Sequence, residues 1–282
     1  MRLRVPATTA NMGSGFDVVG MAIRLQNTVQ FEKAKGLKVL CIGRYGQDID
    51  NAYEVFERAF ERFEEKTGKR IAGVQIIQEC EIPPARGLGS SAAATAAALF
   101  IANVMSGATT PIGELLKIAV ELEGHPDNVL PCMLGGLVVS FYNGERLEYE
   151  RFEVPRFPLT FLVPDFKLST EEMRRAIPET VPFKDALANL RTLALFLSRI
   201  SKGRFDEALG FTSDRLHQPY RIATDSRMRE IIDSIEARNP RYWFVSGSGS
   251  AICCDLQSYE EIPHLEAVVR TMPSNEPLII EM

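Results

Sequence analysis

The chain contains the stretch Pro83-Pro84-Ala85-Arg86-Gly87-Leu88-Gly89-Ser90-Ser91-Ala92-Ala93, which continues as an alanine-rich segment up to Met105. Alanine is the best helix former and serine is a preferred N-cap residue, so this segment predicts a helix that begins at the two serines. The first amides of a helix lack intrahelical partners, the helix dipole is positive there, and glycines let the backbone approach an anion. The stretch is therefore a candidate phosphate cradle, with an ordinary capped core helix as the alternative.

Two familiar phosphate-binding patterns do not fit this stretch. A Walker A loop ends in Gly-Lys-Ser/Thr, and no lysine is present here. The glycines are also spaced differently from those of the dinucleotide fingerprint GxGxxG. The hydroxyls of Ser90 and Ser91 can add hydrogen-bond donors or a metal ligand.

The surrounding sequence predicts a mixture of strands and helices. Apolar residues recur at helical spacing from 53 to 65, and further amphipathic helices are expected at 185–200 and 226–238. A helix is also predicted from Pro111 to Glu123, with Thr110 as its cap and Gly124 at its end. Strand-like runs occur at residues 3–6, 28–31, 37–42, 74–77, 136–141, 159–163, 242–245 and 252–255. Because strands and helices do not alternate regularly, the pattern indicates an α+β fold.

The length predicts two domains. The chain has 282 residues, 45% of them hydrophobic, against about 150 residues for a typical domain. The proline-flanked link at 154–158 is the candidate boundary, which gives an N-terminal domain at 1–154 and a C-terminal domain at 155–282.

Charge and cysteine content limit the class of protein. The formal net charge is -5, from 32 basic and 37 acidic residues, which disfavours a dedicated double-stranded nucleic-acid binder. We also expect no membrane association, since no apolar run approaches the ~18 residues of a span and the N-terminus lacks a signal-peptide core. The five cysteines form no CxxC pair, so we expect reduced thiols in a cytoplasmic protein.

Two further segments carry polar groups that can form a site. Asn11 and Asp17 lie in a segment of small and polar residues that follows the first predicted strand. Glu121, Glu123 and His125 lie where the predicted helix ends, and either carboxylate could hold Mg²⁺. The alternatives are a glycine-rich turn for the first segment and a solvated helix end with an Asx turn for the second.

A glycine-serine turn and two arginines complete the candidates. The turn at residues 246–250 lies between two predicted strands, where its glycines permit close approach of another backbone or a ligand. Arg174 and Arg221 could each grip a carboxylate bidentately, although most arginines in such a charged chain are solvated.

Taken in order, these motifs resemble the GHMP kinase superfamily. The stretch 83–93 is similar to its phosphate loop. The opening at residues 5–17, the segment His125-Pro126-Asp127-Asn128-Val129 and the turn at 246–251 resemble the homoserine kinase family in particular. The matches cover residues 5 to 254.

The resemblance implies a fold and an activity. The N-terminal, ATP-binding half would resemble domain 2 of ribosomal protein S5, with a left-handed βαβ crossover as an exception to the usual handedness. The C-terminal half would be ferredoxin-like, and the protein would be a homodimer. The implied reaction is the ATP-dependent phosphorylation of the hydroxyl of L-homoserine to O-phospho-L-homoserine, a step of threonine biosynthesis.

The resemblance also implies roles for individual residues. Residues 83–93 would wrap the triphosphate, and Ser91 and Glu121 would hold Mg²⁺, with Glu123 as the alternative acid. Asn11 and Asp17 would contact the hydroxyl and amino ends of homoserine. The carboxylate would be bound by His125, Arg174 and Arg221, and Thr170 would lie near the transfer path.

The resemblance does not identify a catalytic base. Some relatives have an aspartate where this chain has Asn128, and an amide cannot accept the hydroxyl proton. We therefore expect catalysis mainly from positioning and charge neutralisation, with Asp17 as the nearest candidate base. Rival interpretations are a sibling kinase acting on mevalonate or shikimate and a non-catalytic binding protein on the same scaffold.

Overall fold

The computed structural model describes residues 1–281, which form two sheets. The first has the order β11-β1-β2-β4-β3, and β5 joins it through β2 and pairs with β6. Its strands are β1 (Arg2–Ala10), β2 (Val19–Lys33), β3 (Leu37–Ile42), β4 (Val74–Glu79), β5 (Leu137–Tyr142), β6 (Leu147–Phe152) and β11 (Ile279–Glu281). Only β3 and β4 pair in parallel, and α1 connects them.

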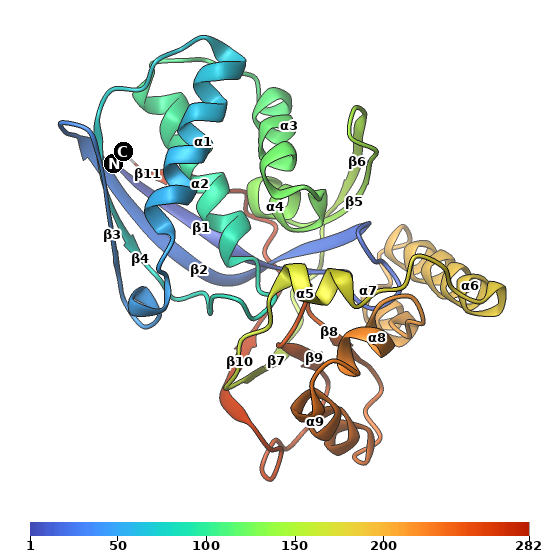
Figure 1. Cartoon of the computed structure of the whole chain (residues 1–282). Coiled ribbons are helices and arrows are strands. Elements are labelled where there is room, and N and C mark those ends of the chain that lie inside the picture. The colour runs from blue at the N-terminus through green and yellow to red at the C-terminus, as the bar shows by residue number, and fades with distance from the viewer. Residues whose placement is uncertain (282) are drawn as a thin grey trace.

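Four helices pack on one face of this sheet (Figure 1): α1 (Ala52–Thr67), α2 (Ser90–Met105), α3 (Ile112–Glu123) and α4 (Pro126–Leu134). The alanine-rich α2 contacts the other three helices and β1, and its buried positions face several directions. Small side chains let these elements approach closely. The alanine run therefore serves a largely buried helix, whose first turn is held at one end of the sheet.

The second sheet has the order β10-β7-β9-β8 and is antiparallel throughout. Its strands are β7 (Leu159–Pro164), β8 (Trp243–Val245), β9 (Ile252–Cys254) and β10 (Leu265–Thr271). Five helices connect β7 to β8: α5 (Thr170–Arg175), α6 (Phe183–Ile200), α7 (Phe205–Ala208), α8 (Gln218–Ile222) and α9 (Ser226–Glu236). This is the split βαβ order expected of a ferredoxin-like sheet, except that residues 255–264, between β9 and β10, contain no helix.

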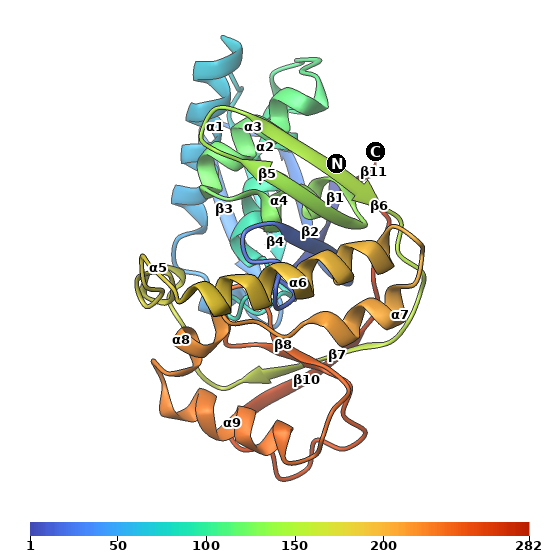
Figure 2. The ribbon, with the colours of Figure 1, turned by 90° about the vertical axis from the view of Figure 1, so that its right-hand side faces the viewer.

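Alternating residues of the second sheet face two hydrophobic cores. Phe161 and Cys253 belong to the main core shared with the first sheet, whereas Leu162 and Ile252 pack under α9. Helix α6 runs along one side of the molecule, level with the boundary between the two sheets (Figure 2), and adds Phe196 to the main core. The two halves are therefore joined by a continuous apolar interior.

The C-terminal segment returns to the first sheet. β11 pairs with β1, so that Arg2 lies opposite Glu281 and the two ends of the chain are side by side (Figure 1). Before this strand, Ser274 exchanges backbone contacts with Ala22 and Gly136. The sequence division at 154/155 stays a prediction, and the predicted second domain does not keep all of its residues within one sheet.

The α+β class is confirmed, and several element boundaries agree with the sequence. The helix predicted to begin at the two serines runs from Ser90 to Met105, and Gly124 ends α3 in the left-handed conformation. Two details differ: Gly89, not a serine, is the N-cap of α2, and Pro111, not Thr110, is the N-cap of α3. The segment for which an Asx turn was the alternative begins helix α4.

Two further features concern the cysteines and the lengths of the helices. All five cysteines are free thiols, and only Cys41 is not buried. Within residues 1–281, no helix combines the length and the apolar character needed to cross a lipid bilayer.

Candidate active site

A cleft of about 800 Å³ is lined by segments from both halves of the chain. Several segments form most of its walls. They are the loop after β1, the start of α1, the loop before α2, the junction of α3 and α4, the start of α5, part of α8 and the turn between β8 and β9. This volume is in the range of small-molecule sites, and polar groups converge on it from several elements.

The first turn of α2 opens into one end of this cleft. Gly89 caps the helix with φ of +73°, and no side chain accepts a hydrogen bond from the first amides. Glycine is required here because a Cβ on Gly89 would lie 2.0 Å from Thr8 Oγ1, and one on Gly87 would lie 2.0 Å from the Ser246 carbonyl oxygen. The uncapped amides and the positive helix end form a site for an anion.

Most of the stretch 83–93 lines the cleft, but not all of it. The lining residues are Pro84, Ala85, Gly87, Gly89, Ser90, Ser91 and Ala92. Arg86 turns away: its Nε donates to the Pro164 carbonyl oxygen at 2.9 Å and its Nη2 pairs with Glu266 at 2.9 Å. Leu88 belongs to the main core, and Pro83 and Ala93 also lie outside the lining. The predicted nucleotide-binding stretch therefore includes four residues whose side chains do not line the cleft.

Gly87→Ala is expected to destabilise the protein strongly. The substitution places a Cβ at a φ of +75°, which costs about 1–2 kcal/mol, and also drives it into the Ser246 carbonyl. Gly107→Ala is the matched control, because Gly107 has φ of +67° and nothing lies within 4 Å of an added Cβ. Urea unfolding should show a clearly larger loss for Gly87→Ala. Equal losses would mean that the close approach to Ser246 is unimportant.

The structure corrects the choice between the two carboxylates at the end of α3. Glu121 faces α1, where Arg62 Nε donates to it at 3.1 Å and Lys66 Nζ donates at 3.0 Å. These contacts lower the pKa of Glu121 although its partial burial acts in the opposite direction. Glu123 lines the cleft and accepts hydrogen bonds from Ser91 Oγ at 3.2 Å and Thr95 Oγ1 at 2.6 Å. Glu123, not Glu121, is therefore the acid beside Ser91.

This pair of groups fits a divalent cation. Magnesium prefers hard oxygen ligands and is bound in proteins by one or two carboxylates together with phosphate oxygens. The Ser91 hydroxyl and the Glu123 carboxylate are oxygen donors in contact with each other, next to the anion site at the start of α2.

At the other end of the cleft, Asn11 and Asp17 are held by their own loop. Their φ values of +67° and +56° lie in the left-handed region, which asparagine and aspartate tolerate better than most residues. The Asp17 amide donates to Asn11 Oδ1 at 3.0 Å, and Asn11 Nδ2 donates to the Gly247 carbonyl oxygen at 2.8 Å. Arg174 grips both oxygens of Asp17, at 2.8 and 2.9 Å. This contact with Asp17 raises the pKa of Arg174.

Arg221 is a buried cation at this end of the cleft. It is only 3% exposed, and its Nη1 donates to the Gly247 carbonyl oxygen at 2.7 Å and to His217 Nδ1 at 3.3 Å. Burial, with the nearby charge of Arg174, lowers its pKa to about 10, so the guanidinium stays charged at neutral pH. Within residues 1–281, no carboxylate forms an ion pair with Arg221, and its Nη2 donates to no protein group. Among the described residues, the Arg221 guanidinium thus has no anionic partner in contact with it.

Three further side chains belong to the cleft, and two of them, His125 and Thr170, were predicted. His125 Nδ1 contacts Asp127 Oδ1 at 3.1 Å; burial acts to lower the pKa of His125, but Asp127 outweighs it and the pKa is raised. Thr170 Oγ1 lies 3.1 Å from Ser248 Oγ at the start of α5. Asn128 Oδ1 accepts from Thr8 Oγ1 at 2.8 Å. All three line the same cleft.

Sequence reasoning missed several residues of this site. Lys167 lines the cleft and its Nζ lies 3.4 Å from Asp48 Oδ1, but a lone lysine in a charged chain gives no signal. His217 was also missed as a site residue. The His217 ring contacts Arg221 on the side away from the cleft. In the sequence, its only signal was its position four residues before Arg221.

Comparisons with known proteins agree with this geometry. The family model described as GHMP kinases N terminal domain matches residues 54–136. The chain is 46% identical over 281 residues to a homoserine kinase of Thermotoga petrophila, covering 99% of both chains. It is 35% identical to a homoserine kinase of Clostridium acetobutylicum, covering 93% of this chain and 89% of that one. Among solved structures, homoserine kinase from Cytophaga hutchinsonii has the same fold, with a TM-score of 0.81, 23% identity and coverage of 99% and 97%.

Proposed function

Since the chain belongs to the homoserine kinase family of GHMP kinases, we propose that its cleft binds ATP and L-homoserine and transfers the terminal phosphoryl group to the homoserine hydroxyl. The products are O-phospho-L-homoserine and ADP, and the reaction is a step of threonine biosynthesis. The place of action is the cytoplasm. The same proposal includes a homodimer, which is supported by large apolar side chains exposed on α6, namely Phe183 at 82% and Leu190 at 63%.

The unpaired Arg221 guanidinium is the observation that carries the choice of substrate. A buried cation whose protein partners are carbonyl oxygens and a neutral ring is stabilised by an anionic ligand. Its free Nη2 can donate to the carboxylate of an amino acid, and Arg174 and His125 can complete the carboxylate site. A neutral sugar would leave this charge unmatched.

The pairing of Asp17 with Arg174 favours a zwitterion over a simple acid. With no substrate bound, the two groups satisfy each other through two hydrogen bonds. A ligand that carries both an ammonium and a carboxylate can replace this ion pair with two new ones. A ligand with only a carboxylate would leave Asp17 without its cation, which opposes binding.

The phosphates of ATP belong at the other end of the cleft. The first amides of α2 would bind their oxygens, and Ser91 and Glu123 would hold Mg²⁺ beside them. A bound Mg²⁺ would neutralise charge on the phosphate oxygens during transfer. These groups therefore orient the terminal phosphate of the nucleotide toward the hydroxyl of homoserine.

The structure supports catalysis by positioning, without a strong base. Both oxygens of Asp17 accept hydrogen bonds from Arg174, and in the proposed complex this carboxylate pairs with the ammonium of homoserine, so Asp17 is used for binding. Asn128 is held by Thr8 and cannot take a proton. A loose phosphoryl-transfer transition state needs little proton removal before transfer, so alignment of the hydroxyl is the main requirement.

Turnover with a panel of acceptors tests the proposed function. With Mg²⁺ and ATP, ADP release should be fast with L-homoserine and at least 100-fold slower with mevalonate, shikimate or galactose at equal concentration. The amine-free analogue 4-hydroxybutanoate should also be a poor acceptor, because it cannot pair with Asp17. Release of ADP with mevalonate or shikimate in preference to homoserine would show a sibling kinase. ATP binding without ADP release for any acceptor would show a binding protein.

A further inference from the structure

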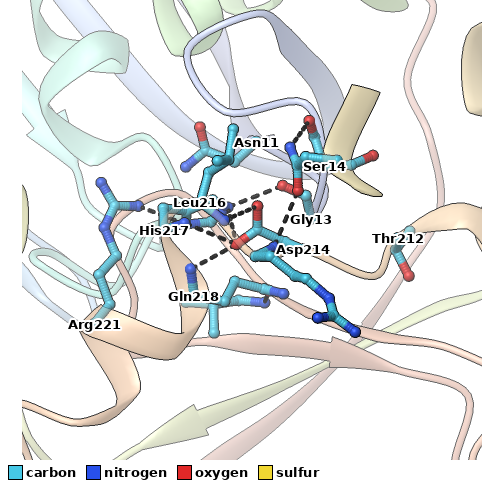
Figure 3. A network of polar contacts seen from close by, with 12 residues as sticks. Asn11, Gly13, Ser14, Thr212, Asp214, Leu216, His217, Gln218 and Arg221 are labelled. Carbon is cyan, nitrogen blue, oxygen red and sulfur yellow. Dashed lines mark hydrogen bonds and ion pairs between the residues drawn. The ribbon is translucent and has the colours of Figure 1, made fainter. Parts of the chain in front are cut away.

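His217 lies directly behind Arg221 and is completely enclosed. Its side chain is 0% exposed, and Figure 3 shows it between the loop that holds Gly13 and helix α8, which carries Arg221. Its Nε2 lies 2.9 Å from the Gly13 carbonyl oxygen, and its Nδ1 lies 3.3 Å from Arg221 Nη1. The ring therefore bridges the two segments that bring Asn11, Asp17 and Arg221 into the cleft.

The partners of the ring determine its tautomer. A carbonyl oxygen can only accept, so Nε2 carries the proton and donates it to Gly13. Burial lowers the pKa of His217 to about 4, so the ring is neutral at physiological pH and Nδ1 keeps a lone pair. That lone pair accepts one Nη1 proton of Arg221, while Gly247 accepts the other. Both Nη1 protons are thus used inside the protein.

Two further contacts prevent the ring from moving. Phe16 stacks on it with a centroid distance of 5.0 Å and an angle of 22°, and the Arg221 guanidinium lies 5.1 Å from the Phe16 ring. Asp214 accepts hydrogen bonds from the backbone amides of Leu216, His217 and Gln218, which fixes the turn before α8 (Figure 3). Phe16 therefore contacts the face of the imidazole, and Gly13 and Arg221 contact its two nitrogens. Asp214 fixes the backbone of His217.

From this arrangement we propose that His217 is a positioning residue for substrate recognition, which holds Arg221 through Nδ1 so that the free Nη2 points into the cleft. The inference rests on the proposed role of Arg221 as a carboxylate ligand. It adds that the orientation of this guanidinium depends on the tautomer of one buried ring.

Two conservative variants separate this role from a general role in folding. In His217→Asn the side-chain oxygen can replace Nδ1 as the acceptor for Arg221, whereas in His217→Gln the amide nitrogen can replace Nε2 as the donor to Gly13. We expect the Asn variant to keep the KM for homoserine within about 3-fold of wild type. We expect the Gln variant to raise it about 10-fold or more. In both variants the KM for ATP should change by less than about 3-fold, since the phosphate end of the cleft is untouched.

A double-mutant cycle and a spectrum of the wild type complete the test. In an Arg221→Lys background, the difference between the Asn and Gln variants should disappear, because the bridging guanidinium is gone. Long-range ¹H–¹⁵N spectra should show His217 as the neutral tautomer protonated at Nε2, and this measurement does not depend on any variant folding. Protonation at Nδ1, or equal homoserine KM values for the Asn and Gln variants, would overturn the inference. Failure of the wild type to use homoserine would instead overturn the proposed function.

Discussion

Glu123→Gln is expected to lower kcat for homoserine phosphorylation by about 10²–10³-fold, a loss of the size measured when one preorganised group that stabilises transition-state charge is removed. Glutamine has the shape of glutamate and can still accept from Thr95 and Ser91, so the fold should be retained. What is lost is the negative charge beside the phosphate end of the cleft. The loss should appear in kcat and in the Mg²⁺ concentration needed for half-maximal rate, measured by coupled ADP release.

Glu121→Gln is the matched control for this prediction. It makes the same chemical change two residues away, on a side chain that pairs with Arg62 and Lys66 at the surface of α1. We expect kcat and the Mg²⁺ dependence to stay within about 2-fold of wild type, because exposed ion pairs contribute little. A large kcat loss for Glu121→Gln, with a small loss for Glu123→Gln, would reverse the assignment made from the structure.

Arg221→Ala is expected to lower kcat/KM for homoserine by about 10²–10³-fold, since it removes a buried charged donor and leaves its protein acceptors unpaired. Those acceptors are the carbonyl oxygens of Gly247 and Met173 and the Nδ1 of His217. The KM for homoserine should carry most of the change, and the KM for ATP should stay within about 3-fold. Steady-state kinetics with each substrate varied in turn measures both.

Arg175→Ala is the control for removal of an arginine near the cleft. Arg175 follows Arg174 directly, but its side chain is exposed, pairs with Glu171 and does not line the cleft. Its removal should leave all kinetic constants within about 2-fold of wild type. An Arg221→Ala effect confined to the KM for ATP would contradict the placement of the homoserine carboxylate.

The sequence alone determined the elements whose signals are local. The helix that begins at Ser90, its alanine run and the glycines before it depend on propensity and on backbone freedom, which neighbouring residues in the chain decide. The same local chemistry marked Asn11, Asp17 and Arg221, and the structure brings these residues to one end of a single cleft. Helix α4 was not predicted, because the polar residues after Gly124 indicated a turn.

Only the tertiary structure could decide between residues that are close in sequence but point in different directions. Glu121 and Glu123 are two positions apart on one helix, which separates their directions by about 200°. The packing of α3 against both α1 and α2 decides which one meets Ser91. The role of His217 likewise depends on contacts with Gly13, more than two hundred residues away. Periodicity along one element contains no information about which neighbour covers each face, and that information comes from the packing of the whole chain.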